Sequence, residues 1–249
     1  MKRAGWAAVA AACLAAGGAL AQDAAEPRRV LVFGDSNSWG WMPAEGGIPT
    51  RRFPSGDQWP NVMAAELGDG YEVVVDALSG RTTDVDDPTA PMGGAALNGA
   101  EYLPAAIAAH LPLDLVVIML GTNDTKAQFG RTPFRIALGA GHLVEIAQAS
   151  GDMFGGGWYD YDAPEVLLVA PPPMGPQTVF AEVFEGDVGV ARSEGLAPAY
   201  QAVAEAAGAG FFDAGSVIET DGSDGVHFTA DTQRALGAAM AEQVRAALE

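Results

Sequence analysis

Residues 30–40 of this chain read VLVFGDSNSWG, and the rest of the sequence is best interpreted from them. An apolar run rich in β-branched residues stops at Gly34 and small polar residues follow, which predicts a buried strand that ends just before Ser36. In open parallel sheets, ligands bind at the carboxyl ends of the strands. Ser36 therefore has two interpretations: a nucleophile at that edge, or the N-cap of a helix that follows.

Further apolar runs of the same kind predict the remaining strands. Continuous runs are typical of strands buried on both faces, and they occupy residues 29–33, 71–78, 114–120, 165–170 and 210–213. Helical spacing predicts helices at residues 60–67, 102–110, 133–149, 192–207 and 230–248. Right-handed crossovers place helices on both faces, so we expect an α/β fold: a three-layer α/β/α sandwich with a five-stranded parallel sheet in the flavodoxin-like order 2-1-3-4-5.

Two stretches have no regular pattern and are expected to be irregular, residues 84–98 and 150–164. Segments of that length in a compact domain tend to form lids or interfaces. The second contains three glycines in a row and then Trp158, Tyr159 and Tyr161, which would contact a substrate, a neighbouring subunit or the core.

The first 21 residues predict a secretory signal peptide. Lys2 and Arg3 form a charged start, an alanine-rich apolar run follows, and an Ala-x-Ala cleavage site ends at Ala21. The run is short for a membrane span. An uncleaved anchor and a lipoprotein site at Cys13 are the alternatives. We expect a protein that is exported, either periplasmic or secreted, with one domain over residues 22–249.

Cleavage would leave 228 of the 249 residues and remove Cys13, the only cysteine. Two of the 13 basic residues would be lost, so that 11 stand against 32 acidic ones and the net charge becomes −21. Such a surface repels nucleic acid and anionic lipid, and we expect neither nucleic acid nor a membrane as a partner after cleavage. The acidity favours neutral or cationic substrates, or serves only the solubility of an exported protein.

Other groups suited to acyl chemistry follow strand ends or precede the last helix. Gly80 follows the second strand, where a glycine lets the backbone approach a bound group. Asn123 follows the third strand, and its amide is suited to stabilise an oxyanion or to form an Asx-turn. Asp224 and His227 lie three residues apart, close enough for the carboxylate to fix the tautomer of the imidazole.

The chain has three histidines, which narrows the choice of a base. His110 ends a helical segment and His142 lies among apolar neighbours, so both are interpreted as structural. Only His227 has a carboxylate nearby in a glycine-containing loop. The sequence lacks the lysine of a phosphate-binding P-loop, the aspartate pattern of a calcium loop and the His-Glu-x-x-His of a zinc site. We expect no metal and no cofactor.

Together these residues resemble the SGNH (GDSL-type) hydrolase superfamily over essentially the whole predicted mature chain. The bacterial arylesterase/acyltransferase branch is the most similar. The resemblance rests on four ordered blocks, which are Gly34-Asp35-Ser36, Gly80, Gly121-x-Asn123-Asp124 and Asp224-x-x-His227, and on matches around Trp39-Gly40-Trp41, Ser79 to Thr83, Asp86-Asp87-Pro88, Leu97-Asn98-Gly99, His110 to Asp114, Met119 to Lys126 and Pro171-Pro172-Pro173.

The resemblance implies a role for each residue of the site. Ser36 would be the nucleophile, His227 the general base and Asp224 the carboxylate that orients the base. The oxyanion hole would consist of the N–H groups of Ser36 and Gly80 and the side chain of Asn123.

Three residues just after the nucleophile are predicted to bind substrate: Asn37, Trp39 and Trp41. Asn37 departs from the family pattern, which usually has leucine at this position, so it would change the shape or polarity of the acyl pocket. The two tryptophans, with Met42, would narrow that pocket, or they only pack onto the core.

The resemblance implies a serine esterase that hydrolyses short-chain acyl esters, acetyl and aryl esters among them, through an acyl-enzyme and without a cofactor. Transfer of the acyl group to alcohols is a further expected activity. The partners would be a small neutral ester and an alcohol acceptor, and homo-oligomerisation is left open. Two other functions remain open: an exported carbohydrate O-deacetylase similar to acetyl-xylan esterases, and a catalytically silent carbohydrate-binding protein on the same fold.

Overall fold

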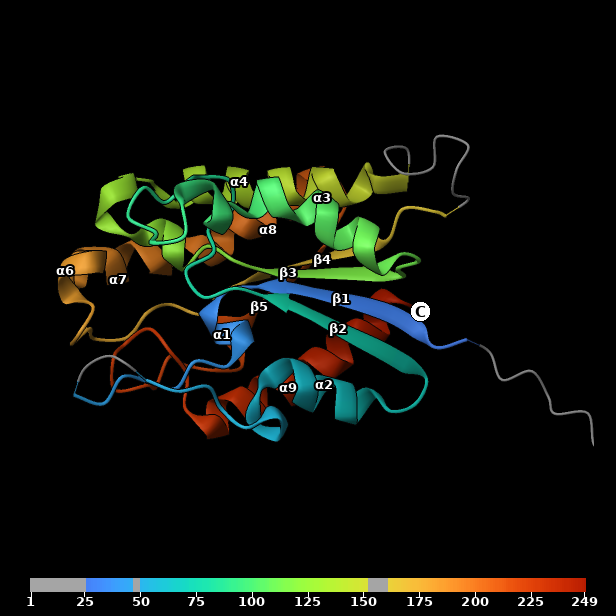
Figure 1. The fold of residues 1–249 in the computed structure, drawn as a ribbon, viewed down its shortest axis with the longest axis horizontal. Coiled ribbons are helices and arrows are strands. Elements are labelled where there is room, and N and C mark those ends of the chain that lie inside the picture. Colours follow the sequence, from blue (N-terminus) through green and yellow to red (C-terminus); the bar gives the residue numbers. More distant parts are fainter. Residues whose placement is uncertain (1–25, 47–49, 152–160) are drawn as a thin grey trace, which may run out of the picture.

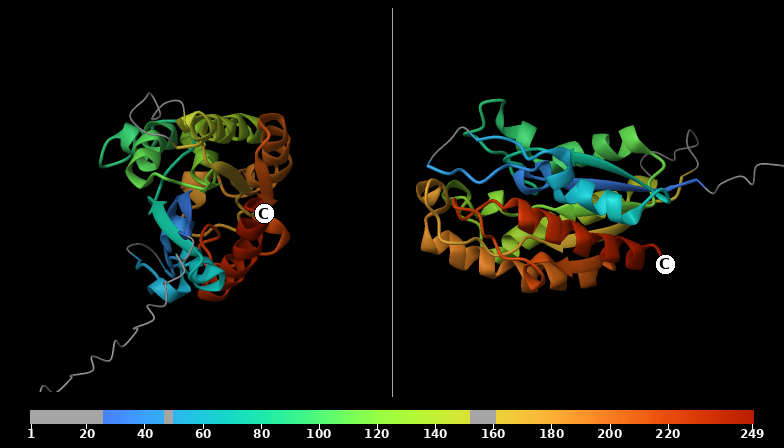
Figure 2. Two further views of the ribbon diagram at one scale, coloured as in Figure 1. Left: turned by 90° about the vertical axis from the view of Figure 1, so that its right-hand side faces the viewer. Right: turned by 90° about the horizontal axis from the view of Figure 1, so that it is seen from below.

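The computed structural model describes residues 26–46, 50–151 and 161–249, which form a three-layer α/β/α sandwich (Figures 1 and 2). In the described part of the chain, parallel strands form one sheet in the order β2-β1-β3-β4-β5. The strands are β1 (Arg28–Gly34), β2 (Tyr71–Ala77), β3 (Leu115–Met119), β4 (Glu165–Ala170) and β5 (Gly210–Asp213). The predicted fold class and strand order are confirmed.

Long helices cover both faces of this sheet (Figure 1). One face carries α3 (Gly99–His110), α4 (Pro133–Gln148) and α8 (Leu196–Ala207), and the other carries α2 (Trp59–Leu67) and α9 (Ala230–Ala247). Shorter helices lie toward the carboxyl ends of the strands: α1 (Ser36–Trp39), α6 (Ala181–Phe184) and α7 (Asp187–Glu194). Single 3-10 turns complete the structure: η1 (Ser55–Asp57), η2 (Gly94–Leu97), η3 (Asn123–Thr125), η4 (Ala127–Phe129) and η5 (Ala214–Ser216).

Each face of the sheet has its own hydrophobic core. In β1, Leu31 and Phe33 pack toward α3, α4 and α8, whereas Val30 and Val32 pack toward α2 and α9. All four side chains are fully buried. This explains why the central strands β1, β3 and β4 contain continuous apolar runs, because helices cover both faces of the sheet there.

The helix predicted over residues 192–207 is in fact two helices, α7 and α8, that meet at Gly195. Pro198 gives the reason: it lacks the N–H that would bond to the carbonyl of Glu194 in a continuous helix, and its ring would collide with that carbonyl. The helix predicted to begin at Tyr102 begins earlier, at Gly99, because the side chain of Asn98 caps it by accepting from the N–H of Ala100 at 3.1 Å.

Several predictions fall on residues that the structure does not describe. The signal peptide at residues 1–21 and the aromatic residues Trp158 and Tyr159 lie outside the described ranges, so export and the role of that segment stay predictions. Among the described helices, none is long and apolar enough to cross a membrane.

Candidate active site

Ser36 is the first residue of α1, directly after the turn that ends β1 (Figure 1). Gly34 is required before that turn, because a Cβ there would lie 2.2 Å from the Oγ of Ser38. Asp35 is the N-cap of α1, and its Oδ1 accepts from the N–H of Asn37 at 3.0 Å. The alternative interpretation of Ser36 as a helix cap is therefore wrong, since the residue before it caps the helix and leaves its hydroxyl available.

A chain of hydrogen bonds joins Ser36 to the loop before α9. The Nε2 atom of His227 lies 3.0 Å from the Oγ of Ser36, and its Nδ1 lies 2.8 Å from the Oδ2 of Asp224. The exposed fractions are 7% for Ser36, 5% for His227 and zero for Asp224, so the chain is largely shielded from water. This is the arrangement of a nucleophile, a base and an orienting carboxylate.

Asp224 is held in its charged form. Burial disfavours the charge, but the bond to His227 and three backbone N–H groups hold the pKa of this carboxyl well below its usual value. Val226 and His227 each donate to Oδ1 at 2.9 Å, and Ala44 donates to Oδ2 at 2.8 Å. The contact with Ala44 was not predicted, because nothing in the sequence relates two residues 180 positions apart.

The predicted oxyanion donors stand at the carboxyl ends of three adjacent strands. Ser36 follows β1, which lies between β2 and β3 in the sheet, Gly80 follows β2, and Asn123 follows β3. Gly80 has a φ of +90°, which other residues rarely adopt. Among the described residues, the N–H groups of Ser36 and Gly80 donate to no protein acceptor. The strand order thus brings together donors from three separate parts of the sequence.

The side chain of Asn123 is already oriented in this structure. Its Nδ2 donates to the carbonyl of Arg81 at 3.2 Å and lies 3.4 Å from the Oδ2 of Asp35. Because both neighbours are acceptors, they fix which end of the amide carries the hydrogens.

A second carboxylate ties the loops after β2 and β3 together. Asp124 is fully buried and accepts from the N–H of Thr83 at 3.0 Å, from its Oγ1 at 2.6 Å and from Arg131 at 2.8 Å. Burial raises the pKa of Asp124 to about 6, although Thr83 and Arg131 favour the charged form. The loops that carry Gly80 and Asn123 are thereby held in register.

Aromatic rings pack against the imidazole of His227. Trp41 stacks on His227 with ring centres 5.4 Å apart and an interplanar angle of 19°, and Phe180 approaches edge-on at 5.7 Å. Trp39 lies further out, 6.2 Å from Trp41, with the guanidinium of Arg52 over its ring at 4.8 Å. Of the two predicted tryptophans, Trp41 borders the base directly. Phe180 had no sequence signal, since it lies in an irregular segment far from the motifs.

Asn37, which was predicted to bind substrate, is buried and makes a contact that the sequence did not predict. Its exposed fraction is only 2%, and its Nδ2 donates to the carbonyl of Val226 at 3.2 Å. The amide therefore joins two parts of the protein, and its role in substrate binding stays a prediction. Its polarity makes this bond possible, which leucine would not.

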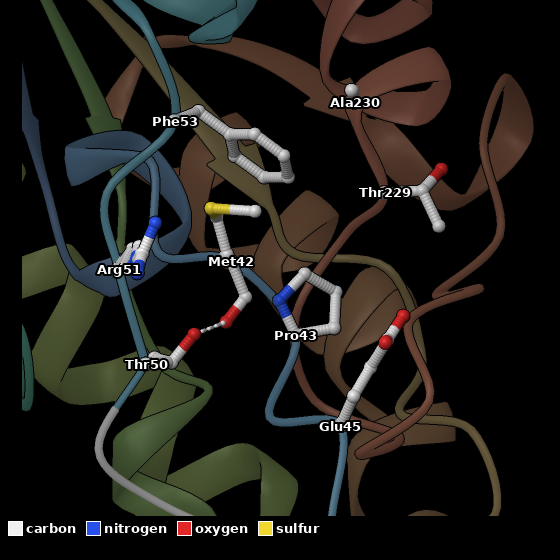
Figure 3. A pocket seen from close by; sticks show the side chains of 8 residues that line it. All are labelled: Met42, Pro43, Glu45, Thr50, Arg51, Phe53, Thr229 and Ala230. Atoms are coloured by element: carbon white, nitrogen blue, oxygen red, sulfur yellow. Dashed lines mark hydrogen bonds between the residues drawn. The ribbon is translucent and has the colours of Figure 1, made fainter.

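Figure 3 shows a pocket of about 410 Å3 that is lined by residues on both sides of Ala44, the residue whose N–H donates to Asp224. Its walls are Met42, Pro43, Glu45, Thr50, Arg51, Phe53, Thr229 and Ala230. Neither Ser36 nor His227 lines it.

The other two histidines take no part in this arrangement. His110 is the last residue of α3. His142 is exposed on α4, whereas its apolar neighbours in the sequence, Leu143 and Val144, are buried. Within the described ranges, no group of three or more histidine, cysteine, aspartate or glutamate side chains is arranged to hold a metal ion.

Comparison with known proteins relates this arrangement to ester hydrolases. The model of the GDSL-like Lipase/Acylhydrolase family matches residues 32–235. An aryl esterase from M. smegmatis is 52% identical, with 89% of this chain and 100% of that chain covered and a TM-score of 0.83. A carbohydrate acetylesterase from Sinorhizobium meliloti is 48% identical, with 88% of this chain and 99% of that chain covered and a TM-score of 0.82.

A lipase/acylhydrolase from Enterococcus faecalis, 20% identical with a TM-score of 0.59, covers 89% of this chain and 97% of its own and shares the fold. No curated protein matches the sequence.

Proposed function

This chain belongs to the GDSL-like lipase/acylhydrolase family and is a carboxylic ester hydrolase of the SGNH type, and from that premise we propose that it cleaves short-chain acyl esters, acetyl esters first, through an acyl-enzyme on Ser36. The observation that carries the proposal is the hydrogen-bonded chain of Ser36, His227 and Asp224. The two similar solved structures are described as an aryl esterase and a carbohydrate acetylesterase, and acetyl transfer to water is a chemistry that both names accommodate.

Acylation begins at the hydroxyl of Ser36. His227 Nε2, 3.0 Å away, accepts the hydroxyl proton as Oγ attacks the acyl carbonyl, and Asp224 stabilises the imidazolium that forms. The carbonyl oxygen becomes an oxyanion that takes hydrogen bonds from the N–H groups of Ser36 and Gly80 and from Asn123 Nδ2. His227 then gives the proton to the leaving alcohol, and the acyl group stays on Ser36.

Deacylation repeats these steps with a second nucleophile. His227 accepts a proton from water as the water oxygen attacks the acyl carbonyl, and a second oxyanion forms. The bond between the acyl group and Ser36 then breaks, the carboxylic acid is released, and His227 returns the proton to Ser36 Oγ. The ionised state of Asp224 suits it to this cycle, because the imidazolium needs a negative partner twice per turnover.

The descriptions of the two similar solved structures support two classes of leaving group, aryl alcohols and carbohydrates. Purified mature protein would be assayed against p-nitrophenyl acetate, butyrate and octanoate beside an acetylated xylo-oligosaccharide. We expect the acetate to be cleaved with the highest kcat/KM of the three aryl esters. Release of acetate from the oligosaccharide at a comparable kcat/KM would make carbohydrate deacetylation the second function. A preference for octanoate, or no hydrolysis of any ester, would contradict the proposal.

Acyl transfer to an alcohol is the finer part of the proposal. Trp41 and Phe180 place apolar rings against His227, the group that activates the second nucleophile, and an apolar border favours an alcohol over water. The chromatographic ratio of ester to free acid, measured against alcohol concentration with an acetyl donor, tests this. Ester should increase with alcohol concentration, and free acid alone at every concentration would identify a plain hydrolase.

A further inference from the structure

Asn37 is a buried residue of the site that the proposed mechanism leaves without a task. It follows the nucleophile directly, and its backbone is fixed on both sides. Its N–H donates to the Oδ1 of Asp35 at 3.0 Å, and its carbonyl accepts from the Nε2 of Gln233 in α9 at 2.9 Å. The side chain therefore projects from a rigid position at the start of α1.

The side-chain amide of Asn37 reaches the loop that carries the base. Its Nδ2 donates to the carbonyl of Val226 at 3.2 Å, across 189 positions of sequence. Val226 is the neighbour of His227, and its own N–H donates to the Oδ1 of Asp224 at 2.9 Å. A single hydrogen bond thus joins the residue after the nucleophile to the residue before the base.

We infer that Asn37 is a positioning residue for the proton transfer between Ser36 and His227. Its amide holds the loop of residues 221–228 against α1 and so sets the 3.0 Å separation of Ser36 Oγ and His227 Nε2. The inference rests on the proposed function, because it gives Asn37 its effect only through these two groups. Proton transfer depends steeply on such geometry, and small displacements reduce turnover strongly.

The oxygen of the Asn37 amide distinguishes the positioning role from a role in stabilising the fold. The Oδ1 of Asn37 is buried and has no hydrogen-bond partner among the described residues. An unpaired buried oxygen opposes folding, so the amide is poorly suited to stabilise the protein. Leucine has the same branched shape and no polar atom, and it would remove both the bond to Val226 and the unpaired oxygen.

The test compares Asn37→Leu and Asn37→Asp with the wild-type enzyme. Three quantities are measured: kcat and KM for p-nitrophenyl acetate, the rate at which a fluorophosphonate labels Ser36, and Tm. For Asn37→Leu we expect kcat and the labelling rate to fall together by about 10-fold, with KM within about twofold of wild type and Tm unchanged or higher. Asn37→Asp keeps the shape but its carboxylate cannot donate to Val226, so its kcat should fall at least as far.

Gln148→Leu is the matched control, because it also removes an amide that donates to a backbone carbonyl, that of Ala207 at 3.0 Å, away from the site. It should leave kcat and labelling unchanged. Wild-type kcat in both Asn37 variants would overturn the inference, and so would a fall in kcat that follows Tm, or a rise in KM with normal labelling. If the wild-type enzyme itself neither cleaves the ester nor is labelled, the proposed function fails, and the inference fails with it.

Discussion

Ser36 differs from Ser38, which carries the other hydroxyl of α1, because the imidazole of His227 lies within hydrogen-bond distance of it. Ser36→Ala removes the nucleophile, and we expect kcat to fall roughly 10³-fold or more, since loss of a member of such a triad normally costs that much. The fold should be intact by circular dichroism and Tm. Ser38→Ala is the matched control two residues on, where the buried hydroxyl has no partner among the described residues. Near wild-type turnover in Ser36→Ala would remove the nucleophile from the proposed mechanism.

In the proposed mechanism, Asn123 stabilises a charge that develops only during the reaction. Asn123→Ala should lower kcat by about 10²-fold with little change in KM, because a bond to an oxyanion is stronger in the transition state than in the ground state. Initial rates over a range of p-nitrophenyl acetate concentrations separate the two parameters. An effect on KM alone would make Asn123 a ground-state binding residue.

At the level of single residues, the sequence predicts most of the groups that the structure brings together. Ser36, Asp224 and His227 could be proposed because each stands in a short motif with a recognisable chemistry. The contacts of Ala44 with Asp224 and of Phe180 with His227 could not, because they depend on the paths of irregular loops. Asn37 shows the limit most clearly: the sequence marks it as unusual, but only the structure shows which carbonyl its amide reaches.

Buried carboxylates join the loops at the carboxyl edge of the sheet, and Asp87 is an example. It lies in residues 84–98, a stretch expected to be irregular, and accepts from Thr89, from Lys126 at 3.1 Å and from Gln128 at 2.8 Å. Burial disfavours its charge, but the bonds from Thr89 and the ammonium of Lys126 hold its pKa below the usual value. The loop after β2 is thereby fastened to the segment after β3.

Asp87→Ala should therefore destabilise the protein rather than change its chemistry. It removes the ion pair with Lys126 and leaves that largely buried ammonium without its acceptor, which costs about 1–3 kcal/mol. For a chain of this size, that lowers Tm by several degrees, at about 2–4 °C per kcal/mol. Thermal unfolding measures the change, with Asp69→Ala in the exposed turn before β2 as the control. Equal Tm values for the two variants would contradict this role.

Secondary structure was predictable wherever hydrophobic pattern alone decides it. All five strands were expected close to their observed positions. In β1, β3 and β4 the reason is burial on both faces, which leaves a continuous apolar run. The split between α7 and α8 was missed although Pro198 signals it, and α1 was missed because a four-residue helix has no period to detect. Such short elements are held by tertiary contacts, so their sequences carry little of their own signal.

At the scale of the whole molecule, the proposed mechanism uses only groups of the chain. In that mechanism Ser36 is the nucleophile, His227 moves its proton and hydrogen-bond donors stabilise the oxyanion, so we expect activity to be independent of metal. Dialysis against EDTA should leave kcat and KM for p-nitrophenyl acetate unchanged, with a zinc hydrolase treated in parallel to show that chelation was complete. Loss of activity that zinc or calcium restores would contradict the expectation.

Stability of the whole protein depends on acids that lie inside it, and Asp35 is the one with the clearest consequence. It is buried beside the nucleophile, and burial raises its pKa from 3.8 to about 6, although the N–H of Asn37 and the nearby His227 and Arg81 favour the charge. Between about pH 4 and pH 6, the folded protein thus retains a proton that the unfolded chain has lost. The stability that Asp35 contributes must therefore fall as the pH rises through this interval. Asp224 has the opposite sign, because its pKa is lowered in the folded protein and its contribution is lost as the pH falls.

Asp35→Asn should remove that pH dependence while keeping the helix cap, because asparagine caps helices as well as aspartate does. The difference in unfolding free energy, variant minus wild type, should rise between pH 4 and pH 6.5 by up to about 3 kcal/mol, the equivalent of the raised pKa. Urea unfolding at half-unit steps of pH measures it. Asp69→Asn, at an exposed site, controls for the change in net charge. A difference that stays constant across this interval would show that Asp35 carries its charge in the folded protein at every pH tested, and that the bonds around it outweigh burial.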